Sequence, residues 1–122
     1  MIRVYLAAAM LTERSALRIM LLDMNMEIAG EADNWLTAFA GTSRSHADIL
    51  IVDWELLPVP SSTALNELRA ICAKALIVVI ISHLGSRQQA VLSAGADFFI
   101  SKSDMPERVS SQLLAAAAKI HI

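Results

Sequence analysis

The sequence has little of the residues that mark several common protein classes. Its single cysteine, Cys72, rules out an intramolecular disulfide framework and fits a reducing compartment. Its 10 lysine and arginine residues are outnumbered by 12 aspartate and glutamate residues, so it lacks the basic surface of a nucleic-acid-binding domain. No apolar run approaches the roughly 18 residues of a membrane-spanning helix, and residues 1–10 do not resemble a signal peptide. We therefore expect a cytoplasmic domain without direct membrane or nucleic-acid contact.

The sequence does have enough apolar material for one compact core. Hydrophobic residues make up 56% of the 122 positions and charged residues 18%, which excludes a disordered chain and indicates a single domain over residues 1–122. The mean hydropathy of +0.53 is high for a soluble monomer, so we expect a partner to cover part of the apolar surface.

Short apolar runs alternate with amphipathic stretches along the chain. The aliphatic run between Asp48 and Asp53 is typical of a strand buried on both faces of a parallel sheet. The predicted strands span 2–7, 27–32, 48–53, 76–82 and 97–101, and the predicted helices span 12–24, 34–41, 63–73, 86–94 and 104–118. This strict alternation predicts right-handed βαβ units, and so a doubly wound, flavodoxin-like α/β domain with a five-stranded parallel sheet and five helices.

Several residues are predicted to bound these elements. Asn34 would cap the second helix and Gly41 would end it. Asp104 and Glu107 have the spacing of a capping box at the start of the last helix. Residues 56–62, with two prolines and two serines, are predicted to form a loop.

Ligands of such sheets bind where the carboxyl ends of the strands meet, so the residues that end each strand carry the functional prediction. An acid closes one aliphatic strand (DILIVD), a hydroxyl closes the next (VVIIS), and AGADFFISK follows. This combination resembles the receiver (CheY-like) domains of bacterial two-component response regulators. The GEA segment at residues 30–32 is similar to receivers attached to helix-turn-helix DNA-binding domains.

The resemblance implies a role for four residues. Asp53 matches the aspartate that accepts a phosphoryl group from a histidine kinase. Ser82 matches the hydroxyl residue that senses the phosphoryl group, and Lys102 matches the lysine that pairs with it. Phe99 falls at the position of the aromatic switch residue.

The resemblance fails at the acidic pair that holds Mg²⁺ in this family. Those positions match Ala8 and Ala9, which offer no ligand to a cation that prefers carboxylate oxygens. Glu55, two residues after Asp53, is a candidate replacement ligand if strand geometry continues past Asp53. The family's proline and glycine after the phosphoacceptor are replaced by Leu57 and Pro58. We therefore expect Mg²⁺ binding to be weak or absent.

Each candidate residue also has a purely structural interpretation. Asp53 can be a strand-end acid that forms a salt bridge with Lys102, and Ser82 can bond to local backbone. Phe99 can be an ordinary core residue, and His83 a surface loop residue. The alanine-rich end of the chain, LLAAAAKIHI, indicates a contact surface or simply favours helix.

We interpret the chain as an atypical receiver that is not an enzyme. In this interpretation it acts through a protein partner or a homodimer, with contacts made by its last two helices, and controls a transcriptional output. It would then be the N-terminal part of a longer regulator. The alternative is a working receiver that a histidine kinase phosphorylates on Asp53. A flavodoxin-like cofactor binder is a third possibility, but AAAML lacks the hydroxyl or glycine residues of a phosphate-binding loop.

Overall fold

The computed structural model describes residues 1–82 and 86–120, so His83 lies outside the described residues. The strands are β1 (Arg3–Ala7), β2 (Glu27–Ala32), β3 (Ile49–Asp53), β4 (Leu76–Ile81) and β5 (Phe98–Ser101). The helices are α1 (Leu11–Asp23), α2 (Trp35–Ser45), α3 (Ser61–Ile71), α4 (Ser86–Ser93) and α5 (Pro106–Ala117), with a short 3-10 turn, η1 (Trp54–Leu56). Within these residues the predicted order of strands and helices is confirmed.

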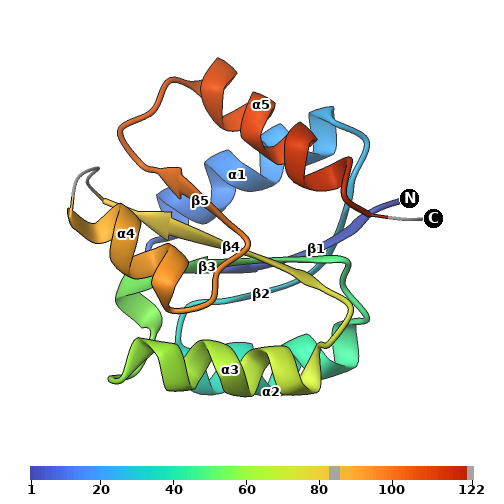
Figure 1. Ribbon diagram of the computed structural model, residues 1–122. Coiled ribbons are helices and arrows are strands. Elements are labelled where there is room, and N and C mark those ends of the chain that lie inside the picture. Colours follow the sequence, from blue (N-terminus) through green and yellow to red (C-terminus); the bar gives the residue numbers. More distant parts are fainter. Residues whose placement is uncertain (83–85, 121–122) are drawn as a thin grey trace.

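The five strands form one parallel sheet in the order β2-β1-β3-β4-β5. Helices α1 and α5 cover one face and α2 and α3 cover the other, while α4 lies beside the β5 edge (Figure 1). Strand order reverses between β1 and β3, so the carboxyl ends of these two strands flank the place where such sheets bind ligands. The predicted doubly wound, flavodoxin-like fold is confirmed.

Alternation along each strand divides the core between the two faces. In β3, Ile49 and Ile51 pack toward α1 and α5, whereas Leu50 and Val52 pack toward α2 and α3. All residues of β3 are buried, because helices cover both faces of a parallel sheet. The acid at the end of this strand, Asp53, is therefore carried into a buried position.

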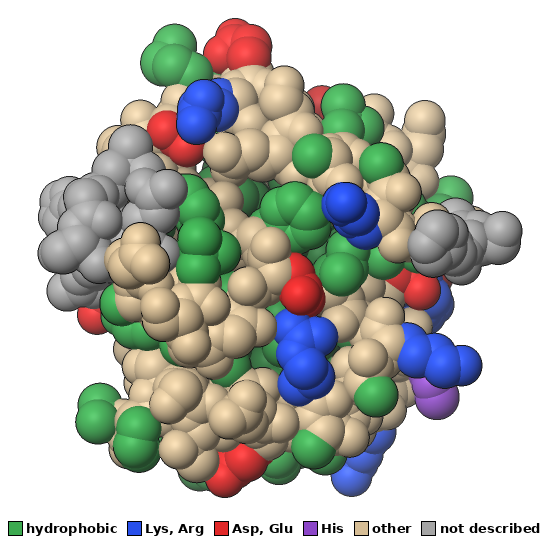
Figure 2. All heavy atoms as spheres, in the orientation of Figure 1, with side chains coloured by type: hydrophobic (Ala, Val, Ile, Leu, Met, Phe, Trp, Pro, Cys, Tyr) green, Lys and Arg blue, Asp and Glu red, His purple; other side chains and the backbone are tan. Residues whose placement is uncertain are grey.

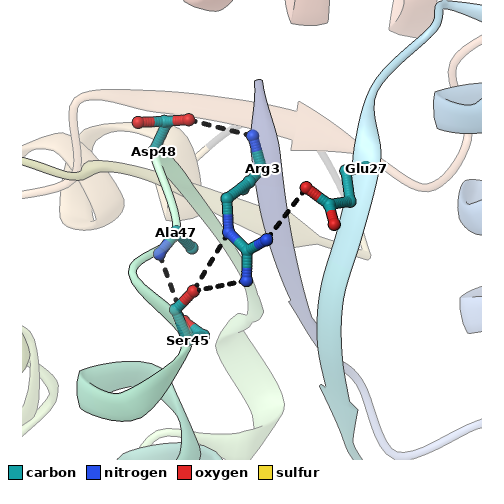
Figure 3. A network of polar contacts seen from close by, with 5 residues as sticks. All are labelled: Arg3, Glu27, Ser45, Ala47 and Asp48. Carbon is teal, nitrogen blue, oxygen red and sulfur yellow. Dashed lines mark hydrogen bonds and ion pairs between the residues drawn. The ribbon is translucent and has the colours of Figure 1, made fainter. Parts of the chain in front are cut away.

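The amino-terminal ends of β1, β2 and β3 are held together by one arginine (Figure 3). The Arg3 guanidinium donates to the Ser45 carbonyl at 2.8 and 3.2 Å and to Glu27 Oε2 at 2.9 Å. The Arg3 backbone N–H donates to Asp48 Oδ2 at 2.9 Å. This network lies at the end of the sheet opposite to the strand ends that carry the predicted functional residues.

Three predictions about element boundaries have different outcomes. Asn34 caps α2 as predicted, since its Oδ1 accepts from the Thr37 N–H at 2.9 Å. The prediction that Gly41 ends this helix is wrong, because α2 continues to Ser45 and ends at His46, whose φ of 53° is left-handed. The predicted loop at 56–62 is too long at both ends, because η1 includes residue 56 and α3 begins at Ser61.

Gly41 and Gly30 are explained by Tyr5 of β1 rather than by breaks in the helix or strand. A Cβ atom at Gly30 would lie 2.6 Å from Tyr5 Cε2, and one at Gly41 would collide with the Tyr5 hydroxyl. The Tyr5 side chain therefore lies across two positions where only glycine leaves room for it.

The predicted capping box of the last helix is wrong. The N-cap of α5 is Met105, and no side chain caps the helix there. The Asp104 carboxylate instead lies 3.5 Å from Arg108 Nε, one turn further along the chain. Pro106 occupies the first turn of α5, where its missing N–H costs no hydrogen bond.

Candidate functional site

The carboxyl ends of the strands bring the predicted site residues to one edge of the sheet. Asp53 is the last residue of β3, and its side chain is only 4% exposed. Lys102 directly follows β5, and Ser82 directly follows β4. Ala8 directly follows β1 and is buried, whereas Ala9 is exposed.

The Lys102 ammonium is the centre of the charged cluster at this edge. Its Nζ lies 2.8 Å from Asp53 Oδ2 and 3.2 Å from Glu13 Oε2. The other carboxylate oxygen of Asp53, Oδ1, accepts a hydrogen bond from the Glu55 backbone N–H at 3.0 Å. We call Asp53, Lys102 and Glu13 the ion triad. It connects β3, β5 and the first turn of α1, so the salt bridge between Asp53 and Lys102 that the sequence suggested is present.

The electrostatic environment keeps Lys102 charged. Burial disfavours the ammonium, but the hydrogen bond and charge of Asp53 and the nearby Glu13 carboxylate outweigh this cost and raise the pKa of Lys102 above its usual value of 10.5. Lys102 is therefore an ammonium at neutral pH. Asp53 Oδ2 and Glu13 Oε2 both contact this one cation. Loss of the ammonium would therefore leave the buried Asp53 carboxylate without its counter-charge.

A guanidinium group occupies the end of β1, where the resemblance implies a metal-binding acidic pair. Arg14 Nη1 donates to the Ala8 carbonyl at 2.6 Å and to the Ala9 carbonyl at 3.3 Å. The same side chain pairs with Glu31 Oε1 at 3.4 Å, and Arg18 pairs with Glu31 Oε2 at 3.2 Å. The backbone oxygens at this strand end are thus already bound by a cation of the chain itself.

The described residues do not fit a Mg²⁺ ion at this edge. Mg²⁺ requires several oxygen ligands in octahedral geometry, usually with one or two carboxylates. Within residues 1–82 and 86–120, no three His, Cys, Asp or Glu side chains come together as a metal site. The Asp53 carboxylate is neutralised by Lys102, and the Ala8 carbonyl faces the Arg14 guanidinium.

Glu55 does not lie on a continuation of strand β3, as its predicted role as a metal ligand requires. The prediction assumed that the strand continues, so that residues two apart point to the same side. The strand instead ends at Asp53, and Trp54–Leu56 form the 3-10 turn η1. The Glu55 contact with Asp53 that the structure shows comes from its backbone N–H. The alternation argument for Glu55 as a metal ligand is therefore wrong.

The remaining predicted residues are placed as follows. Ser82 is half-buried at the end of β4, in the same edge of the sheet as Asp53. Phe99 lies in β5 beside Val79 of β4, and its ring packs against the core between the sheet and α2 and α3. This packing accords with the core interpretation of Phe99 and leaves its switch role a prediction.

Sequence reasoning missed Glu13 and Arg14, the two charged residues in the first turn of α1 that complete the edge. An acid in a first helical turn usually reflects the helix dipole, so its presence carried no functional signal. The available clue was Lys102, because a partly buried ammonium requires counter-charges. Nothing in the sequence spacing indicated that Glu13 would supply a second counter-charge for Lys102.

Comparison with known proteins agrees with this geometry. No protein-family model matches the chain. Over 108 residues, 88% of this chain, it is 27% identical to the nitrate/nitrite response regulator protein NarP of Escherichia coli (strain K12). The isolated REC domain of RcsB from Salmonella enterica serovar Typhimurium, solved with the phosphomimetic BeF3−, superposes with a TM-score of 0.86 at 16% identity, covering 99% of this chain and 91% of that chain.

The chain has the fold of response-regulator receiver domains, and its sequence is similar to that of a response regulator. A LuxR-family two-component response regulator from Aurantimonas sp. SI85-9A1 has the same fold, with a TM-score of 0.80 and 24% identity over 95% of this chain and 84% of that one. The receiver domain spans about half the length of the curated relative it matches, since the NarP match covers 50% of that protein. Within the described residues, the receiver domain has no helix long and apolar enough to cross a membrane.

Proposed function

We propose that this receiver domain transmits signals through protein contacts and does not rely on Mg²⁺-dependent phosphoryl transfer. The observation that carries the proposal is that cationic side chains of the chain itself already fill the region at the carboxyl ends of the strands. Lys102 is held between Asp53 and Glu13, and the Arg14 guanidinium binds the Ala8 carbonyl. Phosphoryl transfer to a carboxylate brings two anions together and depends on a cation that neutralises them. Here the strand-end cations are already paired within the chain.

NMR spectroscopy of the intact domain tests this proposal. Mg²⁺ and beryllofluoride are added at millimolar concentration, and the amide signals of Asp53, Ser82 and Lys102 are followed. We expect no saturable shifts at these positions. A matched variant, Ala8→Asp with Ala9→Asp, restores the missing carboxylates and serves as the positive control. Saturable shifts centred on the site in the unmodified domain would contradict the proposal.

The contact surface that we propose is formed by α4, β5 and α5. Leu92 of α4 is 44% exposed and Leu114 of α5 is 57% exposed. Ala115 near the end of α5 and Ala118, which directly follows the helix, are also exposed, and their small side chains allow another helix to approach closely. Figure 2 looks onto this side of the molecule and shows hydrophobic side chains scattered between polar ones. We expect Leu114→Glu to abolish self-association in analytical ultracentrifugation if the partner is a second copy.

The exposed hydrophobic residues are not confined to that surface. Helix α1 also carries Leu11, Ile19 and Leu22 with more than half of each side chain exposed. The matched variant Ile19→Glu therefore distinguishes the two surfaces. Loss of self-association with Ile19→Glu and not with Leu114→Glu would move the contact from α5 to α1.

Phosphorylation of Asp53 by a histidine kinase is the second candidate function. It is favoured by the direct contact between Asp53 and Lys102, since a lysine at that place can also pair with a phosphoryl group. Intact-mass measurement after incubation with acetyl phosphate tests it. A phosphoryl adduct that disappears in Asp53→Asn would support this function, and the absence of an adduct would exclude it under those conditions.

We further propose that the receiver domain acts within a longer, cytoplasmic regulator that controls transcription. The support is the NarP match, in which the aligned region is half of a response regulator. Immunodetection in cells that carry the intact gene tests the length. A product much longer than 122 residues is expected, and a product of that length would contradict the proposal.

A further inference from the structure

A cavity of about 180 Å³ opens between α1 and α5, beside the ion triad. Its apolar wall residues come from both helices and from two strands: Leu17, Met20, Ile80, Ile100 and Val109. The charged side chains of its lining are Glu13, Lys102 and Asp104. In Figure 2, hydrophobic side chains are visible in a hollow beneath α5.

The size of the cavity suits a small organic molecule. Protein interiors are close-packed and contain few voids larger than a water molecule. An apolar cavity of about 150 Å³ takes up benzene in a well-studied case. The space between α1 and α5 therefore holds one six-membered ring or an equivalent branched aliphatic group. Met20 in the wall can adapt to different shapes, because its side chain is unbranched and flexible.

The chemistry at the mouth of the cavity selects the charge of the ligand. Glu13 Oε2 is inaccessible to solvent and lies against the Lys102 ammonium. Lys102 lies 3.2 Å from it as an ion pair, but this ammonium also serves Asp53 at 2.8 Å. The Lys102 ammonium is thus shared between two acids, and the charged side chains of the cavity lining are two carboxylates and one ammonium.

Asp104 adds to the negative charge at the mouth. Its carboxylate is reached by Arg108 Nε at 3.5 Å, and the Arg108 side chain is 66% exposed. Such an exposed pair contributes little, because water screens it. A ligand that carries a hydrogen-bond donor with positive charge fits this mouth, and a carboxylate ligand would face Glu13 and Asp104.

We propose that this cavity binds a small amphiphilic amine. The apolar body, about the size of one ring, lies among Leu17, Met20 and Val109, and the ammonium group donates to the Glu13 carboxylate in place of Lys102. The ligand ammonium then competes with Lys102 for Glu13, so that binding changes the charge balance of the ion triad. This site does not depend on whether Asp53 accepts a phosphoryl group.

Three probes with the same ring test the proposal: benzylamine, benzyl alcohol and benzoate. Each is titrated into the ¹⁵N-labelled domain without added Mg²⁺, and amide shifts are recorded. We expect saturable shifts for benzylamine in α1, β5 and α5, with an affinity about tenfold higher than that of benzoate, as expected for one charge-assisted hydrogen bond. No saturable shifts with benzylamine, or tighter binding of benzoate, would overturn the proposal.

Two variants separate the charge from the cavity. Glu13→Gln keeps the shape of the mouth and removes its charge, so it should reduce benzylamine affinity to that of benzyl alcohol. Ala16→Leu adds bulk at an exposed position in the cavity lining and should weaken all three probes. Glu107→Gln removes an exposed charge outside the cavity lining and should leave the affinities of all three probes unchanged. Equal benzylamine affinities in the Glu13→Gln and Glu107→Gln variants would also overturn the proposal.

Discussion

The Lys102 ammonium joins the edge strand β5 to the central strand β3, because Nζ lies 2.8 Å from Oδ2 of Asp53. Asp53 is almost fully buried, and Lys102 is about one quarter exposed. The pair therefore lies at the boundary between core and solvent. In this position the Asp53 carboxylate helps to raise the pKa of Lys102.

Removal of the cation should be costly. Lys102→Met leaves the Asp53 carboxylate buried without its counter-charge, so we expect the free energy of unfolding at pH 7 to fall by about 3 kcal/mol. Urea denaturation measures the change. Lys119→Met, at an exposed position, is the control and should be nearly neutral. If Lys102→Met costs no less in an Asp53→Asn background, the two residues are not coupled and the prediction fails.

The raised pKa of Lys102 predicts a loss of stability in alkaline solution. A group whose folded-state pKa lies above its unfolded value of 10.5 contributes its full stability below that value and loses it as pH rises through the folded-state pKa. The urea midpoint should therefore fall above about pH 10, and less steeply in Lys102→Met. Burial also raises the pKa of Tyr5, so Tyr5→Phe is needed as a second comparison. Equal slopes in wild type and Lys102→Met would contradict the role of Lys102.

The contact between Tyr5 and Gly41 should tolerate alanine only when the hydroxyl is removed. A Cβ at Gly41 would collide with the Tyr5 hydroxyl, so Gly41→Ala should destabilise the domain by about 1–3 kcal/mol despite the better helix propensity of alanine. In a Tyr5→Phe background the same change should cost much less. Thermal unfolding of the four proteins measures this, and an equal cost in both backgrounds would rule out the collision as the cause.

The Asn34 cap of α2 provides a test of local structure. Asn34→Ala removes the acceptor of the Thr37 N–H, so we expect a loss of about 1 kcal/mol in the free energy of unfolding. Asn66→Ala, at an exposed position inside α3, is the matched control and should change stability by less than about 0.5 kcal/mol. A cost at Asn66 as large as that at Asn34 would show that the cap contributes nothing special.

The strands were the most predictable part of the fold. The aliphatic runs that became β3 and β4 are buried on both faces, and this pattern reads directly from the sequence. The ends of α2 and α5 were less predictable. A glycine such as Gly41 commonly ends a helix. Here it instead makes room for the Tyr5 side chain, which is distant in sequence, so no local sequence pattern predicts the contact.

The candidate site also has features that the sequence predicted and features that it did not. Asp53, Ser82 and Lys102 are adjacent to strand ends, so the alternation of strands and helices alone predicts that they meet at one edge of a parallel sheet. Alanine at positions 8 and 9, where the resemblance implies acids, is likewise visible in the sequence. The strand geometry on which the prediction for Glu55 depended is wrong, because the chain enters η1 immediately after Asp53.

The sequence by itself therefore determined the receiver fold, the end of the sheet at which its charged residues gather, and the alanines that follow its first strand. Only the tertiary structure decided which charges meet there. Glu13 reaches Lys102, and Arg14 reaches the Ala8 carbonyl, because α1 packs its first turn over the ends of β1 and β5. Hydrophobic periodicity specifies which face of a helix is buried, whereas ion pairs between its ends and distant strands depend on how the elements pack in three dimensions.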